Sequence, residues 1–287
     1  MFKTKELPIP RGILTDVDRT LLDSNRQISA KNQAAIEKYL IEFKKNPQLP
    51  RLALCTARHP AALVNTVLPV FTKFAPDSLH VVCDGAMLIN SKTEVFWQEA
   101  IDSVIVKEIC ETIEKIGGSF AFGNDDTIYS SKIFLEERQQ AHEPIKHLPC
   151  TAIKNQENWS TTLIIVNHLN EAVEEYLKAL RDKSSLHLQK IVSTFNHQYY
   201  YNITLNDVSK ANGLKKWAEY YQLNPADIVM IGDSKNDFEA MKIGIGVAVA
   251  NADPAVKEVA RLVLEQSNDE DAVACFLQEL LKITTTI

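Results

Sequence analysis

The stretch that most constrains this chain is Asp16-Val17-Asp18-Arg19-Thr20, which directly follows the apolar segment Gly12–Thr15. Four consecutive apolar or small residues of this kind predict a short buried strand. Two ionised carboxylates at the end of such a strand cost several kcal/mol unless a nearby cation or a raised pKa compensates. Because Asp also favours turns, this stretch alone fits a simple turn equally well. The rest of the chain must decide between a turn and a site.

Strand and helix patterns alternate in the first and last thirds of the chain. An apolar stripe at helical spacing follows Ser29, a typical helix N-cap, and another helix is expected from about Pro60 to Pro69. This alternation favours an α/β fold, a doubly wound, Rossmann-like parallel sheet with helices on both faces. Further strands are expected at residues 52–55, 79–83, 227–231, 246–249 and 262–264, and further helices around residues 214–221 and 273–280.

The pattern changes between residues 89 and 200, where short strand-like pieces surround two amphipathic helices. The first helix pattern runs from Val106 to Ile116 and stops at two glycines, which commonly end helices. We therefore predict an α/β core domain of residues 1–88 and 201–287 and an inserted α+β domain of residues 89–200. The expected strands of the insertion are residues 119–122, 127–129, 161–166, 188–193 and 198–204, and its second helix covers 173–180.

Polar residues stand at the carboxyl ends of several predicted core strands. Asp16 and Asp18 end the first strand, Thr56 the second, Asp84 the third and Asp233 a late one. In an open parallel sheet this edge is where ligands bind, and Lys210 adds a cation just before a predicted helix. Taken one at a time, these residues have structural explanations as turn formers, helix caps or an exposed lysine. Their combination at one edge favours a site.

Composition excludes several other classes of function. The net charge is −6 and the basic residues are scattered, so no stripe for a nucleic-acid backbone is present. The sequence has neither an apolar run long enough for a membrane helix nor an apolar region typical of a signal peptide near its start. Its five cysteines are an odd number and widely spaced, which is typical of reduced thiols. We predict a cytoplasmic protein that binds neither nucleic acid nor membranes.

The chain resembles the haloacid dehalogenase (HAD) superfamily of phosphatases, and specifically the Cof-like subclass with a large α+β (C2-type) cap. Four motifs occur in the family's order and spacing, and together they span nearly the whole chain. They are DVDRTLL at residues 16–22, CTARH at 55–59, DVSKANGL at 207–214 and GDSKND at 232–237. The resemblance implies that the inserted domain is the cap and that it governs substrate specificity.

The resemblance also implies a Mg²⁺-dependent reaction on a small phosphate ester through an aspartyl-phosphate. Asp16 corresponds to the nucleophile, and Asp18 corresponds to the acid that protonates the leaving group and the base that then activates water. The acid role requires a raised pKa at Asp18. The metal ligands are expected to be Asp16, the backbone carbonyl of Asp18, and Asp233, with Asp237 supporting them. The phosphate would be bound by the Val17 and Ala57 amides, Thr56, Lys210 and Asn236.

Two departures from the family pattern bear on specificity. Arg19 stands where many relatives carry Gly, which costs on the order of 1 kcal/mol if the position needs a positive φ. Asp84 replaces the usual Asn before Gly-Ala, and its charge would disfavour an anionic group on that side. A protein that binds phosphate or sugar phosphate without turnover is an alternative on the same fold, as is a phosphomutase. The acid–base carboxylate of Asp18 favours the phosphatase.

Overall fold

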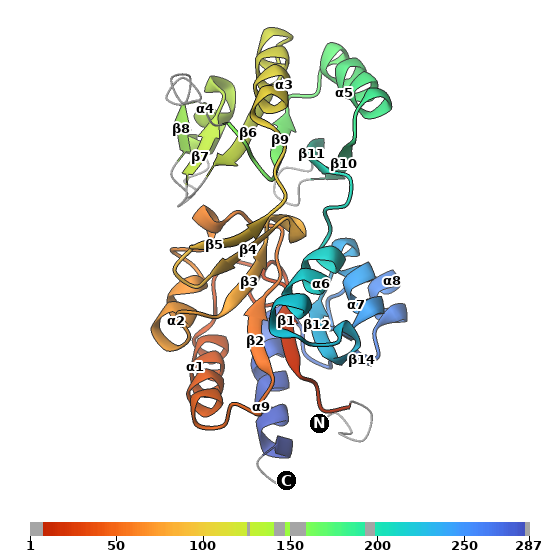
Figure 1. Ribbon diagram of the computed structural model, residues 1–287. Helices are drawn as coiled ribbons and strands as arrows, with labels where there is room; N and C mark the ends of the chain where they lie inside the picture. The colour runs from red at the N-terminus through yellow and green to blue at the C-terminus, as the bar shows by residue number, and fades with distance from the viewer. Residues whose placement is uncertain (1–7, 125–126, 141–146, 150–158, 193–198, 285–287) are drawn as a thin grey trace. The chain divides into compact units, whose positions relative to one another are not determined.

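The computed structural model describes residues 8–124, 127–140, 147–149, 159–192 and 199–284 (Figure 1). The chain divides into two compact units, which we call the core unit and the insert unit. The predicted insertion of residues 89–200 differs from the insert unit at both ends, because residues 89–97 belong to the core unit and 201–208 to the insert unit. The core unit comprises Met1–Arg58, Leu63–Trp97 and Ser209–Ile287, and the insert unit comprises His59–Ala62 and Gln98–Val208.

A five-stranded parallel sheet forms the centre of the core unit, in the order β14-β13-β12-β1-β2. Every residue of β1, β12 and β13 is buried, which explains why these strands read as unbroken apolar runs in the sequence. The predicted doubly wound α/β core is confirmed. Its strands are β1 (Gly12–Thr15), β2 (Arg51–Leu54), β12 (Ile228–Gly232), β13 (Ile245–Ala248) and β14 (Leu262–Val263).

A second, antiparallel sheet continues from the edge of β2. An isolated parallel bridge joins Cys55 to Val81, and the amide of Leu54 donates to Nδ1 of the buried His80 at 3.1 Å. The sequence predicted only the first of its strands, because the domain boundary expected at residue 89 falls within the second strand and places the third inside the insertion. The strands, in order across this sheet, are β3 (Leu79–Val82), β4 (Met87–Asn90) and β5 (Val95–Gln98).

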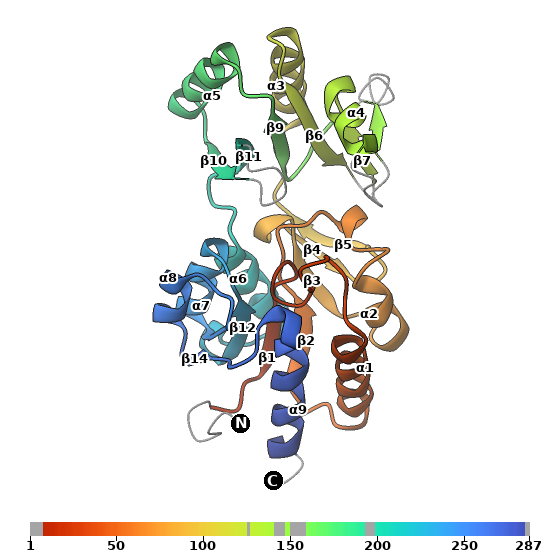
Figure 2. The ribbon, with the colours of Figure 1, turned by 180° about the vertical axis from the view of Figure 1, so that it is seen from behind.

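Helices cover both faces of the core sheet. Figures 1 and 2 show α1 and α9 packed together on one face and α6 on the other. The Ser29 hydroxyl caps α1 by accepting a hydrogen bond from the amide of Asn32, as expected. The core helices are α1 (Ala30–Lys45), α2 (Leu68–Phe74), α6 (Lys210–Tyr221), α7 (Phe238–Ile243), α8 (Pro254–Val259) and α9 (Ala272–Thr284), with 3₁₀ turns η2 (Cys83–Gly85), η4 (Pro225–Asp227), η5 (Lys235–Asp237) and η6 (Asn268–Glu270).

The helix predicted from Pro60 to Pro69 is wrong. Only a 3₁₀ turn, η1, forms at Pro60–Ala62, and the α-helix begins at Leu68. Pro69 therefore lies in the first turn of α2 and does not end a helix. Proline is tolerated there because its missing N–H would have no partner within the helix. Proline can occur in the first turn of a helix or just after its last turn, and the prediction placed Pro69 at the end of a helix when it lies at the start of one.

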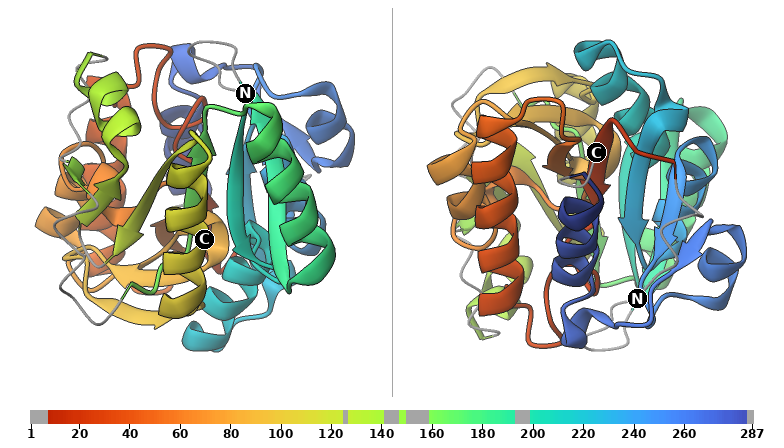
Figure 3. Two further views of the ribbon diagram at one scale, coloured as in Figure 1. Left: turned by 90° about the horizontal axis from the view of Figure 1, so that it is seen from above. Right: turned by 90° about the horizontal axis from the view of Figure 1, so that it is seen from below.

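The insert unit is a six-stranded sheet with α3 and α5 lying across one face (Figure 3). Its core includes Phe122, whose ring stacks on Tyr129 and Trp159. The predicted α+β character is confirmed, but α4 and β8 were not predicted, and the strand expected from Thr161 begins at Ile164. Ser193 and Gln198, the ends of two predicted strands, lie outside the described residues. The strands, in order across the sheet, are β10 (Leu186–Val192), β11 (Tyr199–Leu205), β9 (Ile164–Asn167), β6 (Ser119–Asn124), β7 (Thr127–Ser130) and β8 (His147–Pro149), and the helices are α3 (Ser103–Lys115), α4 (Lys132–Gln140) and α5 (Glu171–Lys183).

None of the helices in the described part of the chain has the length and apolar character needed to cross a membrane.

Candidate active site

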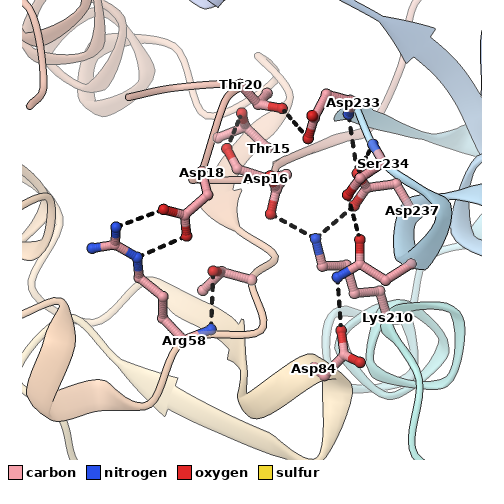
Figure 4. A network of polar contacts seen from close by, with 12 residues as sticks. Thr15, Asp16, Asp18, Thr20, Arg58, Asp84, Lys210, Asp233, Ser234 and Asp237 are labelled. Atoms are coloured by element: carbon pink, nitrogen blue, oxygen red, sulfur yellow. Dashed lines mark hydrogen bonds and ion pairs between the residues drawn. The ribbon is translucent and has the colours of Figure 1, made fainter. Parts of the chain in front are cut away.

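Two neighbouring parallel strands place Asp16 and Asp233 at the same edge of the core sheet (Figure 4). Asp16 follows β1 directly, and its amide donates to the carbonyl of Ile231 in β12 at 2.8 Å. Asp233 follows β12 directly. Both side chains are buried, with 4% of Asp16 and 1% of Asp233 exposed. The strand order therefore brings together two carboxylates that are more than two hundred residues apart in the sequence.

Lys210 reaches the same place from the first position of α6. Its ammonium lies 2.6 Å from Oδ1 of Asp16 and 2.6 Å from Oδ1 of Asp237, and the side chain is 1% exposed. Gly85 makes this approach possible. It has a φ of +101°, and a Cβ at this position would lie only 1.9 Å from the carbonyl oxygen of Ser209, the residue before Lys210. Only glycine lets the start of α6 come this close.

Asp237 supports the cluster through both of its carboxylate oxygens. One oxygen accepts from Lys210, and the other accepts from the backbone amides of Asp233 and Ser234, each at 3.0 Å. The side chain is fully buried. Asp237 therefore fixes both the ammonium and the turn that carries Asp233.

The three buried carboxylates carry more negative charge than the neighbouring side chains neutralise. Burial lowers the pKa of Lys210, but the charges of Asp16 and Asp237 outweigh it and hold that pKa well above its usual value, so the lysine stays protonated. Burial and the neighbouring carboxylates raise the pKa of Asp16 well above its ordinary value, although Lys210 opposes this. Burial and the Asp237 charge raise the pKa of Asp233 to about 6. A further cation would relieve this excess of negative charge.

The donor set fits a divalent metal ion such as Mg²⁺. One carboxylate oxygen from each of Asp16, Asp233 and Asp237 lies within 4.8 Å of the other two, and carboxylate oxygens are preferred Mg²⁺ ligands. Oδ2 of Asp233 is buried and has no hydrogen-bond donor among the described residues. Because both oxygens of Asp237 already accept hydrogen bonds, Asp16 and Asp233 are better placed than Asp237 to offer oxygens to a metal.

Asp18 is turned toward Arg58, which follows β2. The guanidinium forms two parallel hydrogen bonds to the carboxylate, from Nε at 2.8 Å and from Nη2 at 2.6 Å. Partial burial raises the pKa of Asp18, but the hydrogen bonds and charge of Arg58, helped by Arg26 and Lys210, lower it below its ordinary value. The expectation of a raised pKa is therefore wrong for this arrangement. Arg58 belongs to the second motif, but the sequence did not predict this contact.

The other predicted site residues occupy the same edge with different partners. Thr56 is buried and its hydroxyl accepts from the amide of Arg58 at 3.1 Å. Among the described residues, Asn236 forms no hydrogen bond with Lys210 or Asp16. Its side-chain amide donates to Asp84 at 3.1 Å. Val17 is fully buried and Ala57 is half-buried, both in the turns that follow β1 and β2.

Two residues of the first motif contact Asp233 directly. The hydroxyl of Thr20 lies 3.5 Å from Oδ1 of Asp233, and Nε of Arg19 lies 3.5 Å from Oδ2. Arg19 has a φ of 56°. This is the positive φ that would favour glycine at this position, and the chain nevertheless carries an arginine here. The spacing of the first and fourth motifs did not predict either contact, because both depend on how the turn after β1 folds.

The amino-acid sequence matches a family model described as haloacid dehalogenase-like hydrolase over residues 13–277. A Haemophilus influenzae protein that is named as a phosphatase without a stated substrate is 22% identical over 275 residues, which cover 94% of this chain and 97% of the relative. The 5-amino-6-(5-phospho-D-ribitylamino)uracil phosphatase of Bacillus subtilis is 32% identical over 146 residues, which cover 44% of this chain and 52% of the relative.

Solved structures show the same fold at low sequence identity. A haloacid dehalogenase-like hydrolase from Bacteroides thetaiotaomicron superposes with a TM-score of 0.78 at 18% identity, covering 94% of this chain and 99% of the other. A haloacid dehalogenase-like hydrolase from B. subtilis gives a TM-score of 0.71 at 20% identity, with coverage of 94% and 99%.

Proposed function

This chain belongs to the haloacid dehalogenase-like hydrolase family and is a phosphoric monoester hydrolase, and we propose that it is a Mg²⁺-dependent phosphatase of small phosphorylated metabolites. In this proposal the reaction passes through an aspartyl-phosphate on Asp16. One observation carries it: the buried carboxylate of Asp16 lies 2.6 Å from the protonated amine of Lys210, beside a second buried carboxylate at Asp233. The roles of these residues follow from that arrangement.

Asp16 is suited to attack phosphorus because its position is fixed from two sides. Its backbone is held by β12 and its side chain by Lys210, so the carboxylate loses little conformational entropy when a substrate binds. An oxygen of Asp16 forms the new bond to phosphorus while the bond from phosphorus to the ester oxygen breaks. The electron pair of the broken bond goes to the leaving oxygen, which takes up a proton. Water then attacks phosphorus, which releases phosphate and restores Asp16.

Lys210 stabilises the negative charge of the phosphoryl oxygens during both steps. It is already protonated and buried, so it can act without a change of ionisation or solvation. Asp16, Asp233 and the backbone carbonyl of Asp18 would hold Mg²⁺. When bound, Mg²⁺ supplies positive charge that offsets the repulsion between the Asp16 carboxylate and the phosphate.

Asp18 is proposed as the general base for water and as the acid for the leaving group. The ion pair with Arg58 favours the ionised form, which suits the base role directly. The acid role requires that this pair be broken, because a carboxylate that accepts two bonds from a guanidinium holds no proton to donate. Asp18 is half-exposed, so such a movement meets little packing resistance.

The proposed substrate class is a small phosphomonoester such as a sugar phosphate. One of the Bacillus subtilis relatives is named for a small phosphorylated ribitylamino compound. A phosphoglycolate phosphatase of Methanosarcina acetivorans is 41% identical over 83 residues, which cover 29% of this chain and 37% of the relative. The net charge of −6 gives no help in binding polyanions. We propose that the insert unit is the cap, which selects among leaving groups.

A panel of phosphorylated metabolites and one aryl phosphate tests the proposal. We expect phosphate release that disappears with excess EDTA, returns with Mg²⁺ and is absent in Asp16→Asn. Full activity in chelator would contradict the metal requirement, and activity in Asp16→Asn would contradict the nucleophile. The best metabolite in the panel would define the substrate class.

A further inference from the structure

We propose that Arg19 competes with Mg²⁺ for the carboxylate of Asp233, and that this built-in cation weakens metal binding. The inference rests on the proposed function, because it takes Mg²⁺ as the ion that the site binds. It concerns a residue that departs from the family pattern, in which many relatives have glycine after the second aspartate. Arg19 is thereby assigned a role in tuning the metal site, whereas the carboxylates hold the metal.

The guanidinium of Arg19 lies next to a carboxylate oxygen that is available to a metal. Nε is 3.5 Å from Oδ2 of Asp233, the buried oxygen that accepts no hydrogen bond from the described residues. The arginine therefore neutralises part of the negative charge that Mg²⁺ would otherwise neutralise. A cation bound at this oxygen and the guanidinium repel each other.

The arginine is firmly anchored at its backbone and loosely held at its tip. Its carbonyl accepts from the side chain of Asn251 at 2.8 Å, and Asn251 in turn accepts from the amide of Asn268 at 2.9 Å. The guanidinium, by contrast, makes its two described contacts at 3.5 Å, to Asp233 and to the carbonyl of Asn251, and half of the side chain is exposed. The tip can therefore move into solvent when a metal binds, while the base of the side chain stays at the site.

The size of the competition follows from the type of contact that is lost. A half-exposed ion pair contributes up to about 1 kcal/mol, which corresponds to roughly fivefold in an equilibrium constant. We expect removal of the Arg19 charge to strengthen Mg²⁺ binding by about three- to fivefold. The gain in Mg²⁺ affinity should come from removal of the charge. It should not come from relief of backbone strain, although Arg19 has a positive φ that glycine adopts more easily.

Isothermal titration of Mg²⁺ into the metal-free full-length protein measures this directly. The variants are Arg19→Gly, which removes charge and backbone strain, and Arg19→Ala, which removes charge but keeps a Cβ. Arg26→Gly is the matched control, because Arg26 has a φ of 60° in the same loop and its charge acts on Asp18. We expect both Arg19 variants to bind Mg²⁺ about three- to fivefold more tightly than wild type, and Arg26→Gly to bind as wild type does. The Mg²⁺-induced rise in Tm should increase in the same two variants.

Each other outcome decides against the inference. Equal affinity in wild type and both Arg19 variants overturns it and leaves the proposed metal site intact. Tighter binding in Arg19→Gly alone assigns the effect to backbone strain, and an equal gain in Arg26→Gly assigns it to the net charge of the loop. Failure of wild type and Arg19→Gly alike to bind Mg²⁺ overturns both the inference and the metal part of the proposed function.

Discussion

Replacing Lys210 by Met should destabilise the core unit strongly, because two buried carboxylates would lose their shared cation. Methionine keeps a side chain of similar length and removes the ammonium, which makes 2.6 Å contacts to Asp16 and Asp237. Breaking a buried ion pair by removing one partner costs about 3–5 kcal/mol. That is a large share of the roughly 5–15 kcal/mol that a typical domain has in total.

Urea unfolding of the metal-free protein at pH 7.5 measures the loss. The chain has three tryptophans, of which Trp97 and Trp217 lie in the core unit and Trp159 in the insert unit. A Trp159→Phe background therefore makes fluorescence report the core unit. Lys216→Met is the matched control, because Lys216 lies in the same helix and its contact with Glu219 at 3.1 Å is largely exposed. The control should lose no more than about 1 kcal/mol.

The pH dependence of the loss has a definite sign. Lys210 opposes the rise in the pKa of Asp16, so the variant should raise that pKa further above its value in the unfolded chain. A carboxyl group whose folded pKa is raised destabilises the fold above that pKa, and the penalty fades as pH falls through it. The deficit of Lys210→Met should therefore be smaller at pH 5.5 than at pH 8. A loss no larger than that of Lys216→Met, or one that grows as pH falls, would refute the reasoning.

Three further predictions concern the metal, a buried histidine and the substrate. Asp233→Asn should weaken Mg²⁺ binding by about 10-fold or more in calorimetry, since the ligand loses its charge; unchanged affinity would remove Asp233 from the metal site. Burial lowers the pKa of His80 to about 3, so this imidazole takes up a proton in the unfolded chain at a higher pH than in the folded protein. His80 alone should therefore reduce the free energy of unfolding by roughly 1.4 kcal/mol for each pH unit below pH 6.5. His80→Gln should therefore show a shallower decline, and an identical slope would contradict the buried neutral imidazole. The kcat/KM for the best small phosphate ester should exceed that for any phosphopeptide by at least about 10-fold, and equal values would count against a small-molecule phosphatase.

The core could be predicted well because each buried parallel strand corresponds to a short, continuous apolar run in the sequence. β1 and β12 are buried at every position, so each reads as an apolar run that stops at a charged residue. The parallel order of the strands then brings Asp16 and Asp233 together without further information. Lys210 could be added because its motif places it at the start of a helix with a recognisable apolar face.

The parts that were missed depend on side chains meeting across turns. Arg58 is two residues after Thr56, but its contact with Asp18 depends on how the turns after β1 and β2 fold, which no periodicity encodes. Asn236 has a partner in Asp84, whose φ of 56° belongs to a turn with several positive φ values. These contacts set charges and orientations within the site, whereas the strand pattern sets only its location.

Mass spectrometry of the acid-quenched enzyme tests the central claim that Asp16 is the nucleophile and Asp18 the acid and base. Wild type, Asp16→Asn and Asp18→Asn are each mixed with an aryl phosphate and Mg²⁺, then quenched and digested. The account predicts no phosphoenzyme in Asp16→Asn, because an amide is a poor nucleophile. It predicts a phosphoenzyme on Asp16 that persists in Asp18→Asn, because an activated leaving group needs little protonation while hydrolysis still needs the base. A phosphoenzyme in Asp16→Asn, or the same behaviour in both variants, would contradict the assignment.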